Sequence, residues 1–256
     1  MHWADYTAQR LMERGDEQVS ASGITPSGEF HIGHLREILS AEMIHRACLD
    51  AGMSSKYIFI VDSMDPLRRV YDFLSPEYEE FIGCPLAYIP APDEDGSPGD
   101  GSVTYADHFL SPFLDSLEQI GVRPEVVMNH ETYERGLFAE YIDSAITNRK
   151  EIRSIIQQIS GRELPHDWFP YNPMGSGGSM DGVTVTGYEK PYVVWRDSTG
   201  NEGKSDIRKA HGKMPWRVDW AARWVIHGIT CEPAGKDHGA AGGSYDTGIP
   251  ICRLLG

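Results

Sequence analysis

The stretch that decides the fold runs Ala21-Ser22-Gly23-Ile24-Thr25-Pro26-Ser27-Gly28-Glu29-Phe30-His31-Ile32-Gly33-His34-Leu35-Arg36-Glu37. A short β-prone run over residues 18–21 leads into a loop with glycines and a proline, and a helix is expected to begin near residues 31–34. The first turn of a helix presents backbone N–H groups without partners, and the helix dipole favours an anion there. The stretch therefore predicts a phosphate site after the first strand.

The residues that follow predict a βαβ unit. Apolar residues recur at near-helical spacing over residues 35–47, and residues 56–62 form a nearly continuous apolar run, typical of a parallel strand covered on both faces. Further strands are expected at residues 86–90, 124–129 and 226–231, and helices at 2–16, 106–120 and 136–161. Strands that alternate with helices indicate an α/β fold with a doubly wound parallel sheet, in which ligands bind beyond the carboxyl ends of the strands.

The pattern changes between residues 165 and 215, which are rich in glycine, proline and turn signals. Residues 183–186 and 192–195 flank a turn in the manner of a β-hairpin, which indicates a small inserted module instead of another βα repeat. We therefore expect three parts. They are the first half of a Rossmann-like nucleotide-binding domain (1–135), a helical and β-hairpin insertion that forms a connective module (136–215), and the second half of the domain (216–256).

The composition indicates a globular protein without a broad basic surface. Of the 256 residues 40% are hydrophobic and 24% charged, and the formal net charge is -15. The densest basic run, residues 204–217, is either a solvated face or a local nucleic-acid contact. The four cysteines include no Cys-x-x-Cys pair, and no apolar run approaches the ~18 residues of a membrane span. A cytoplasmic protein with reduced thiols and no membrane contact is expected.

The start of the predicted helix carries two histidines, His31 and His34. Neither a P-loop nor a Gly-x-Gly-x-x-Gly fingerprint is present. The two histidines lie three residues apart on one helix face, where their ring N–H groups can donate to phosphate oxygens. Taken alone, such a pair is more often half of a metal site or two surface histidines.

Further motifs agree with this pair in order and spacing. They are His2-Trp3-Ala4-Asp5, Gly23-Ile24-Thr25-Pro26-Ser27-Gly28, Asp65-Pro66-Leu67-Arg68, Trp216-Arg217-Val218-Asp219-Trp220, Gly235-Lys236-Asp237-His238 and Gly242-Gly243-Ser244-Tyr245-Asp246. Together with His31-Ile32-Gly33-His34, they resemble the class I lysyl-tRNA synthetases along the whole chain. The resemblance implies a class I Rossmann-like catalytic domain that uses ATP with Mg²⁺ to form lysyl-adenylate and then transfers lysine to tRNA(Lys).

The resemblance also implies roles for single residues. His31 and His34 are expected to be catalytic phosphate contacts, with the alternative that His34 only caps the helix. Glu37 is expected near the lysine side chain, with the alternative of an exposed helix charge paired to a neighbour. The implied ATP-binding residues are Pro26, Gly28, Gly33, Gly235, Lys236, Asp237 and His238. The implied lysine-binding residues are Gly23, Thr25, Glu37, Trp220 and Tyr245.

Two features depart from the family that the chain resembles. Its inserted module usually carries two cysteine pairs, consistent with a structural zinc, but residues 170–178 and 195–203 contain no cysteine, so neither zinc nor another metal site is expected. The chain also ends before a Lys-Met-Ser-Lys-Ser-like loop and an anticodon-binding domain, so we expect a truncated catalytic domain with impaired activity. Two alternatives stay open: a paralogue that activates or binds lysine outside translation, and a non-catalytic binding module.

Overall fold

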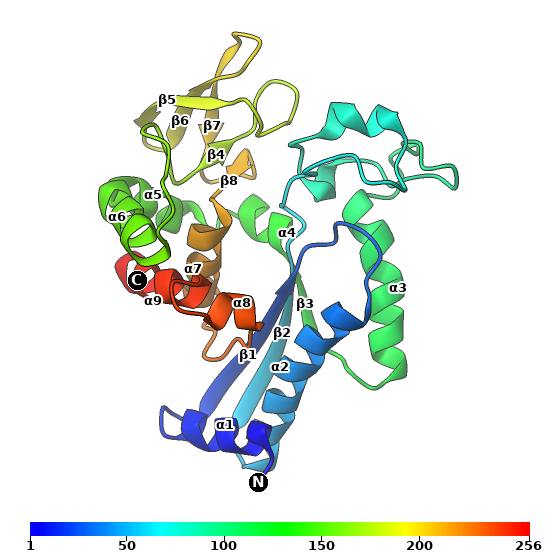
Figure 1. The fold of residues 1–256 in the computed structure, drawn as a ribbon, viewed down its shortest axis with the longest axis vertical. Coiled ribbons are helices and arrows are strands. Elements are labelled where there is room, and N and C mark those ends of the chain that lie inside the picture. The colour runs from blue at the N-terminus through cyan, green and yellow to red at the C-terminus, as the bar shows by residue number, and fades with distance from the viewer.

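A computed structural model describes residues 1–256 as an α/β fold around a parallel sheet (Figure 1). The strands are β1 (Glu17–Ile24), β2 (Ser54–Val61) and β3 (Glu125–Met128), in the order β1-β2-β3. The other edge of β1 pairs in parallel with one further residue, Cys231, whose carbonyl accepts the Ala21 N–H at 2.9 Å. The sheet thus extends in both directions from β1, which confirms the predicted α/β class with a doubly wound sheet.

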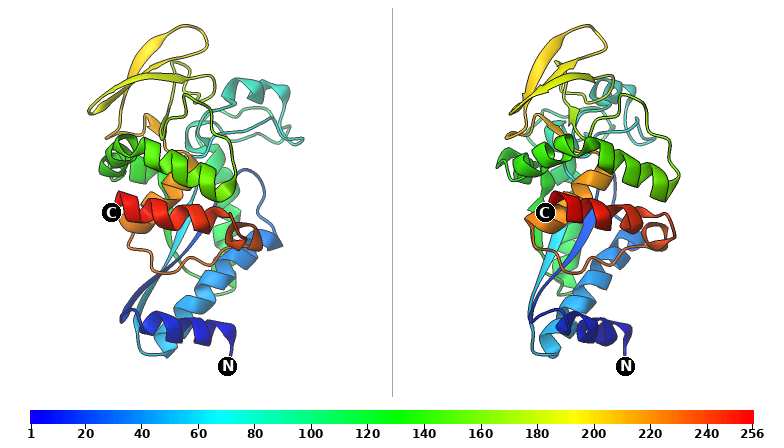
Figure 2. Two further views of the ribbon diagram at one scale, coloured as in Figure 1. Left: turned by 60° about the vertical axis from the view of Figure 1, so that its left-hand side comes forward. Right: turned by 90° about the vertical axis from the view of Figure 1, so that its left-hand side faces the viewer.

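Helices cover the sheet on both sides (Figures 1 and 2). The long ones are α1 (Trp3–Met12), α2 (Ile32–Asp50), α3 (Tyr105–Gln119), α7 (Trp216–Ile226) and α9 (Ser244–Leu255). On one face Ile38 of α2 and Phe113 of α3 pack in one cluster with Phe59 of β2. α7 and α9 lie together on the opposite side, and α1 packs against α2. The last five residues of β2 are buried without interruption, as the apolar run over 56–62 predicts.

Shorter elements fill the connections. The remaining helices are α4 (Asn129–Glu134), α5 (Ala139–Thr147), α6 (Arg149–Ser160) and α8 (Lys236–Gly239), with 3₁₀ helices at Pro76–Phe81 and Leu86–Tyr88. The strands of the insertion are β4 (Asn172–Pro173), β5 (Thr184–Glu189), β6 (Tyr192–Arg196), β7 (Glu202–Asp206) and β8 (Gly212–Lys213). β5 and β6 form the predicted hairpin, and β7 adds a third antiparallel strand to it.

Two predicted elements are wrong in kind. Residues 86–90 form a 3₁₀ helix instead of a strand, and the flanking Pro85 and Pro90 have no N–H to donate to a ladder. Residues 136–161 form two helices instead of one. Asn148 leaves the helical conformation at φ -95° and ψ 18°, and its side-chain amide donates to the Ser144 carbonyl at 3.0 Å.

The C-terminal part differs from the prediction as well. The predicted strand at residues 226–231 is reduced to Cys231, because α7 continues to Ile226 and a turn follows it. The glycine-rich loop predicted over residues 242–246 is shorter, since α9 already begins at Ser244. Both differences leave the chain at the same edge of the sheet, so the location of the site is unaffected.

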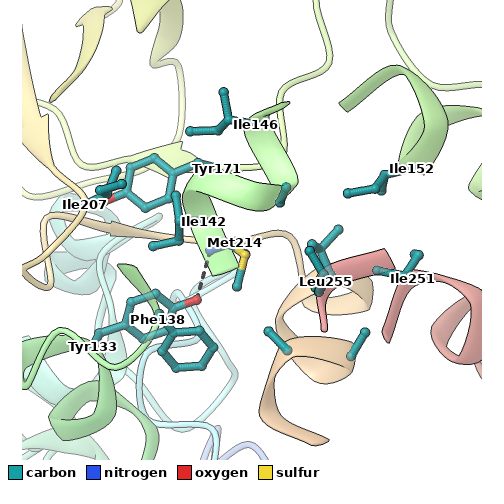
Figure 3. Packing of buried hydrophobic residues seen from close by; sticks show 14 of the residues in the cluster. Tyr133, Phe138, Ile142, Ile146, Ile152, Tyr171, Ile207, Met214, Ile251 and Leu255 are labelled. Carbon is teal, nitrogen blue, oxygen red and sulfur yellow. Dashed lines mark hydrogen bonds between the residues drawn. The ribbon is translucent and has the colours of Figure 1, made fainter. Parts of the chain in front are cut away.

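The largest hydrophobic core joins the insertion to α7 and α9 (Figure 3). Its members from the insertion include Phe138, Ile142 and Tyr171, and Ile251 and Leu255 come from α9. The insertion therefore packs on the C-terminal helices instead of standing apart from them. The division of the chain at residues 136 and 216 stays a prediction.

Asp197 connects the two loops at which the resembled family usually carries cysteine pairs. Its Oδ1 accepts from the Thr199 hydroxyl at 2.7 Å and from the Asn201 N–H at 2.9 Å, and its Oδ2 accepts from the Ser176 hydroxyl at 2.7 Å. These hydrogen bonds, the one from Thr199 first, hold the pKa of Asp197 well below its usual range. Hydrogen bonds thus join residues 170–178 to residues 195–203.

Replacing Asp197 with alanine is expected to loosen the insertion without unfolding the sheet, because Ser176 and Thr199 lose their shared acceptor. Amide hydrogen exchange should accelerate in β5, β6 and β7 and stay unchanged in β1 and β2. Asp167→Ala, an exposed carboxylate of the same insertion that makes no hydrogen bond, is the matched control. Equal exchange rates in the two variants would contradict a structural role for Asp197.

Candidate active site

A cleft of about 600 Å³ opens at the carboxyl ends of β1 and β2. Ile24 pairs with Val61 in the register of the two strands, so the residues that follow them meet at one level. Because Cys231 extends the sheet on the other side of β1, the cleft lies at the switch point where doubly wound sheets bind ligands. The predicted site residues that line it are Gly23, Thr25, His34, Glu37, Trp220 and His238. Those that do not line it are Pro26, Gly28, His31, Gly33, Gly235, Lys236, Asp237 and Tyr245.

His31 and His34 cap the first turn of α2 with one nitrogen each. The Nδ1 of His31 accepts from the Gly33 N–H at 3.0 Å, and the Nδ1 of His34 accepts from the His31 N–H at 3.1 Å. A ring nitrogen that accepts a hydrogen bond carries no proton, so a neutral ring holds its proton at Nε2. Capping therefore fixes the tautomer and leaves an Nε2–H on each histidine free to donate to a ligand.

The two imidazole rings act as a unit. They stack at 4.0 Å between centroids, with 24° between the planes. Burial, and the neighbouring His31 next, lower the pKa of His34. His34 is thus a neutral donor at pH 7, half-buried in the cleft wall, while His31 is exposed.

Gly33 has a local structural reason in addition to the predicted one. A Cβ on Gly33 would stand 2.7 Å from Cε1 and 2.9 Å from Nδ1 of His31, so any side chain would displace that ring. A Cβ on Gly28 would meet the Phe73 ring at 3.3 Å. The direct contacts with ATP predicted for these glycines and for Pro26 stay predictions.

The segment 235–238 faces α2 across the cleft. A Cβ on Gly235 would lie 3.5 Å from Oε1 of Glu37. Glu37 is half-buried and forms no ion pair, so the alternative of a paired surface charge is wrong. The ring of His238 packs on Trp220 at 5.6 Å between centroids, and its Nδ1 lies 3.0 Å from the Ser244 hydroxyl.

Aromatic rings form one wall of the cleft. Trp220 is 7% exposed and lines the cleft, while Tyr245 packs against it at 5.1 Å between centroids. Trp224 stacks on Tyr245 at 5.8 Å with 19° between the planes. Tyr245 thus holds Trp220 in place, and it does not itself face the cleft.

A buried charge network lies beneath the cleft, and sequence reasoning missed it. Arg223 donates from Nη1 to Oδ1 of Asp62 at 2.6 Å, and its Nε lies 2.9 Å from Oδ1 of Asp219. The Tyr133 hydroxyl donates to the second oxygen of Asp219. Arg223 is therefore shared by two carboxylates that approach from different elements.

A second ion pair adjoins the first. Lys213 donates from Nζ to Oδ1 of Asp65, and the Thr25 hydroxyl donates to Oδ2 of Asp65 at 2.7 Å. The predicted lysine contact Thr25 thus commits its only hydroxyl proton to the protein, and its oxygen can only accept from a ligand. Asp65 stood in a sequence motif without an assigned role, and its partner lies 148 residues further along the chain.

The two aspartates of the network titrate differently. Burial raises the pKa of Asp62 to about 6, with Asp65 adding to the rise and Arg223 opposing it. Burial would also raise the pKa of Asp65, but Lys213 and the hydrogen bond from Thr25 hold it below its usual value. The nearby carboxylates raise the pKa of Lys213 and Arg223 in spite of their burial, so both stay charged.

The raised pKa of Asp62 predicts a pH-dependent stability. Because the folded value lies above the unfolded 3.8, the contribution of this carboxyl is present below about pH 4 and is lost as the pH rises through about 6. Asp62→Asn lacks this loss, so the variant should gain stability relative to the parent protein between about pH 4 and pH 7. Urea unfolding of both proteins across this range measures the difference, and a constant difference would contradict the raised pKa.

A sequence signal for part of the network existed. Asp62 directly follows a continuous apolar strand, and polar residues at the carboxyl ends of parallel strands face the ligand site. Asp219 and Arg223 stand four residues apart, a spacing that permits a pair on one helix face. No local signal joins Arg223 to Asp62, because 161 residues separate them.

The structure contains no group of three or more His, Cys, Asp or Glu side chains placed to hold a metal ion. An Mg²⁺ that arrives with ATP does not require one, since this ion is usually held by substrate phosphates and one or two carboxylates. Every helix is too short or too polar to cross a membrane.

Comparison with known proteins identifies the family. The family model described as tRNA synthetases class I (K) matches residues 1–256. The lysine–tRNA ligase of Picrophilus torridus is 44% identical over 252 residues, which are 98% of this chain and 48% of that protein. The lysine–tRNA ligase of Archaeoglobus fulgidus is 44% identical over 256 residues, 100% of this chain and 50% of that protein. The chain spans about half the length of these relatives, and it belongs to the class I lysine-type tRNA synthetase family.

Proposed function

We propose that the chain is the catalytic portion of a lysine–tRNA ligase, which activates lysine with ATP and transfers it to tRNA(Lys). The supporting observation is that one cleft combines two chemically different ends. At one end the first turn of α2 and the Nε2–H of His34 are suited to phosphate, and at the other end carboxylates and the Trp220 ring are suited to an aliphatic cation. A ligand with a polyanionic part and a cationic amino-acid part matches this arrangement.

The activation step requires charge stabilisation more than acid–base chemistry. The lysine carboxylate attacks the α-phosphorus of ATP, the bond to the bridging oxygen breaks, and pyrophosphate leaves with the electron pair. His31 and His34 donate from Nε2, and the unpaired N–H groups of α2 add to the positive potential where negative charge develops. We assign the adenosine to residues 235–238, where Asp237 accepts from ribose hydroxyls. Lys236, Gly28 and Pro26 complete the proposed ATP site.

The lysine is proposed to lie between β1 and α7. Gly23 and Thr25 contact its α-groups, Trp220 covers the methylene chain, and Glu37 offsets positive charge. Tyr245 contributes by fixing Trp220. Each of these residues except Tyr245 lines the same cleft, which supports assigning them to one ligand.

The partner tRNA and the cytoplasmic location are proposed from the names of the relatives, which are ligases of lysine and tRNA. The basic run over residues 204–217 does not support a tRNA contact of its own. Lys204 pairs with Glu189 at 3.5 Å, Arg208 pairs with Asp206 at 2.7 Å, and Lys213 is buried against Asp65. The run thus serves mainly internal ion pairs.

Lysine-dependent exchange of labelled pyrophosphate into ATP tests this function. The complete gene product is used, because the relatives are about twice as long as this chain. We expect exchange with lysine and none with norleucine, followed by lysine transfer to tRNA(Lys). Exchange without transfer would favour the paralogue that activates lysine outside translation, and lysine binding without exchange would favour the non-catalytic module.

A further inference from the structure

Two carboxylate oxygens bound the space above Gly23. If residue 23 carried a Cβ, this atom would lie 3.6 Å from Oε1 of Glu232 and 3.7 Å from Oδ2 of Asp62. Gly23 belongs to β1, is exposed to the cleft and has no positive φ, so its backbone conformation does not require glycine. The missing side chain instead leaves a space into which both oxygens face.

Each of the two carboxylates has its other oxygen already bound. Oε2 of Glu232 accepts from the Trp224 indole N–H at 2.7 Å, and Oδ1 of Asp62 accepts from Arg223 at 2.6 Å. No protein group donates to Oε1 of Glu232 or Oδ2 of Asp62. The protein thus fixes the orientation of both carboxylates and leaves one acceptor on each for a ligand.

The charges around this space do not balance. Arg223 Nη1 would lie 3.8 Å from the same Cβ position, so one cation and two carboxylates surround it, with a net charge of about -1. Unpaired charge away from bulk water is unfavourable, and burial accordingly raises the pKa of Asp62. One further positive charge placed above Gly23 would neutralise the group.

We propose that Asp62 and Glu232 together bind the side-chain ammonium of lysine in the space that Gly23 leaves open. This proposal rests on the proposed function and adds the residues that select the side chain. The assignment to the side-chain end follows from the positions along the cleft, since the α-carboxylate must reach the phosphates near His34.

Glu37 marks the phosphate end, because it lies three residues after His34 on the same helix and contacts Gly235. Glu232 is three residues before Gly235, a separation of at most about 10 Å along the chain. The methylene chain of lysine fits between these two carboxylates, beside Trp220. Glu37 is thereby left to the α-ammonium, and Asp62 and Glu232 take the other end.

Glu232→Gln is the decisive variant, because the glutamine carbonyl still accepts from Trp224 while the negative charge is lost. Lysine and norleucine, which lacks the side-chain ammonium, are titrated into the complete protein by calorimetry. We expect lysine affinity to fall roughly 10- to 100-fold and norleucine affinity to stay the same, because one charge-assisted hydrogen bond is removed. Asp62→Asn should behave alike, and Glu94→Gln, an exposed charge change elsewhere, should leave both affinities unchanged.

Unchanged lysine affinity in Glu232→Gln would overturn the proposal, as would an equal loss for norleucine, which would place the α-ammonium there. Thermal melting of each variant with and without lysine shows that the fold is retained. A parent protein that binds no lysine at all would refute the proposed function itself, and this result is distinct from a parent that binds lysine equally well with and without Glu232.

Discussion

His34→Ala is expected to lower the rate of lysine-dependent pyrophosphate exchange by about 100-fold or more, because it removes a positioned donor to the developing charge. The variant also loses the bond from His34 Nδ1 to the His31 N–H, which costs about 0.5–2 kcal/mol of stability as other helix caps do. The fold should therefore persist, with a slightly lower melting temperature. Exchange rates and thermal melting measure the two effects separately.

The comparison with His34→Asn separates catalysis from capping. The side-chain oxygen of asparagine takes the place of Nδ1 and restores the cap, but nothing takes the place of the Nε2–H. We expect stability to return to the parent value while exchange stays low. Recovery of exchange in His34→Asn would mean that His34 serves only as a cap, the alternative that the sequence left open.

Arg223→Met is expected to have the largest effect on stability, a loss of about 3–5 kcal/mol. The substitution leaves Asp62 and Asp219 close together in the interior with no cation between them, and Arg223 itself is only 5% exposed. Urea unfolding at pH 7.5 measures the loss. Part of the stability should return in the double variant Arg223→Met with Asp62→Asn, because one of the two unpaired charges is then removed.

A surface arginine provides the control for this effect. Arg123 pairs with Glu118 at 3.4 Å, and both side chains are largely exposed, so Arg123→Met should change stability very little. Equal effects of Arg223→Met and Arg123→Met would contradict the account of the buried network.

The parts of the fold that sequence predicted are those set by local physics. The run over residues 56–62 predicted β2 because a parallel strand is buried on both faces, and the start of α2 at Ile32 follows from the loop and histidines before it. The strand predicted at residues 86–90 failed because tertiary contacts decide that segment. There the Leu86 N–H bonds to the Asp65 carbonyl instead of a neighbouring strand.

The candidate site was predicted where motifs lie within one loop or helix turn. Gly23, Thr25, His34 and Glu37 come from one continuous stretch, and the structure brings them to one cleft. The charge network escaped because its pairs join residues far apart in the chain, as Arg223 and Asp62 do. Nothing in local spacing tells a buried ion pair from two solvated charges.

A crystal structure of the complete protein with a non-hydrolysable lysyl-adenylate analogue tests the central claim most directly. The account predicts the phosphate mimic beside Nε2 of His31 and His34, the methylene chain on Trp220, and the side-chain ammonium between Asp62 and Glu232. An analogue bound outside this cleft, or bound in it with the ammonium remote from both carboxylates and the phosphate mimic remote from α2, would contradict it.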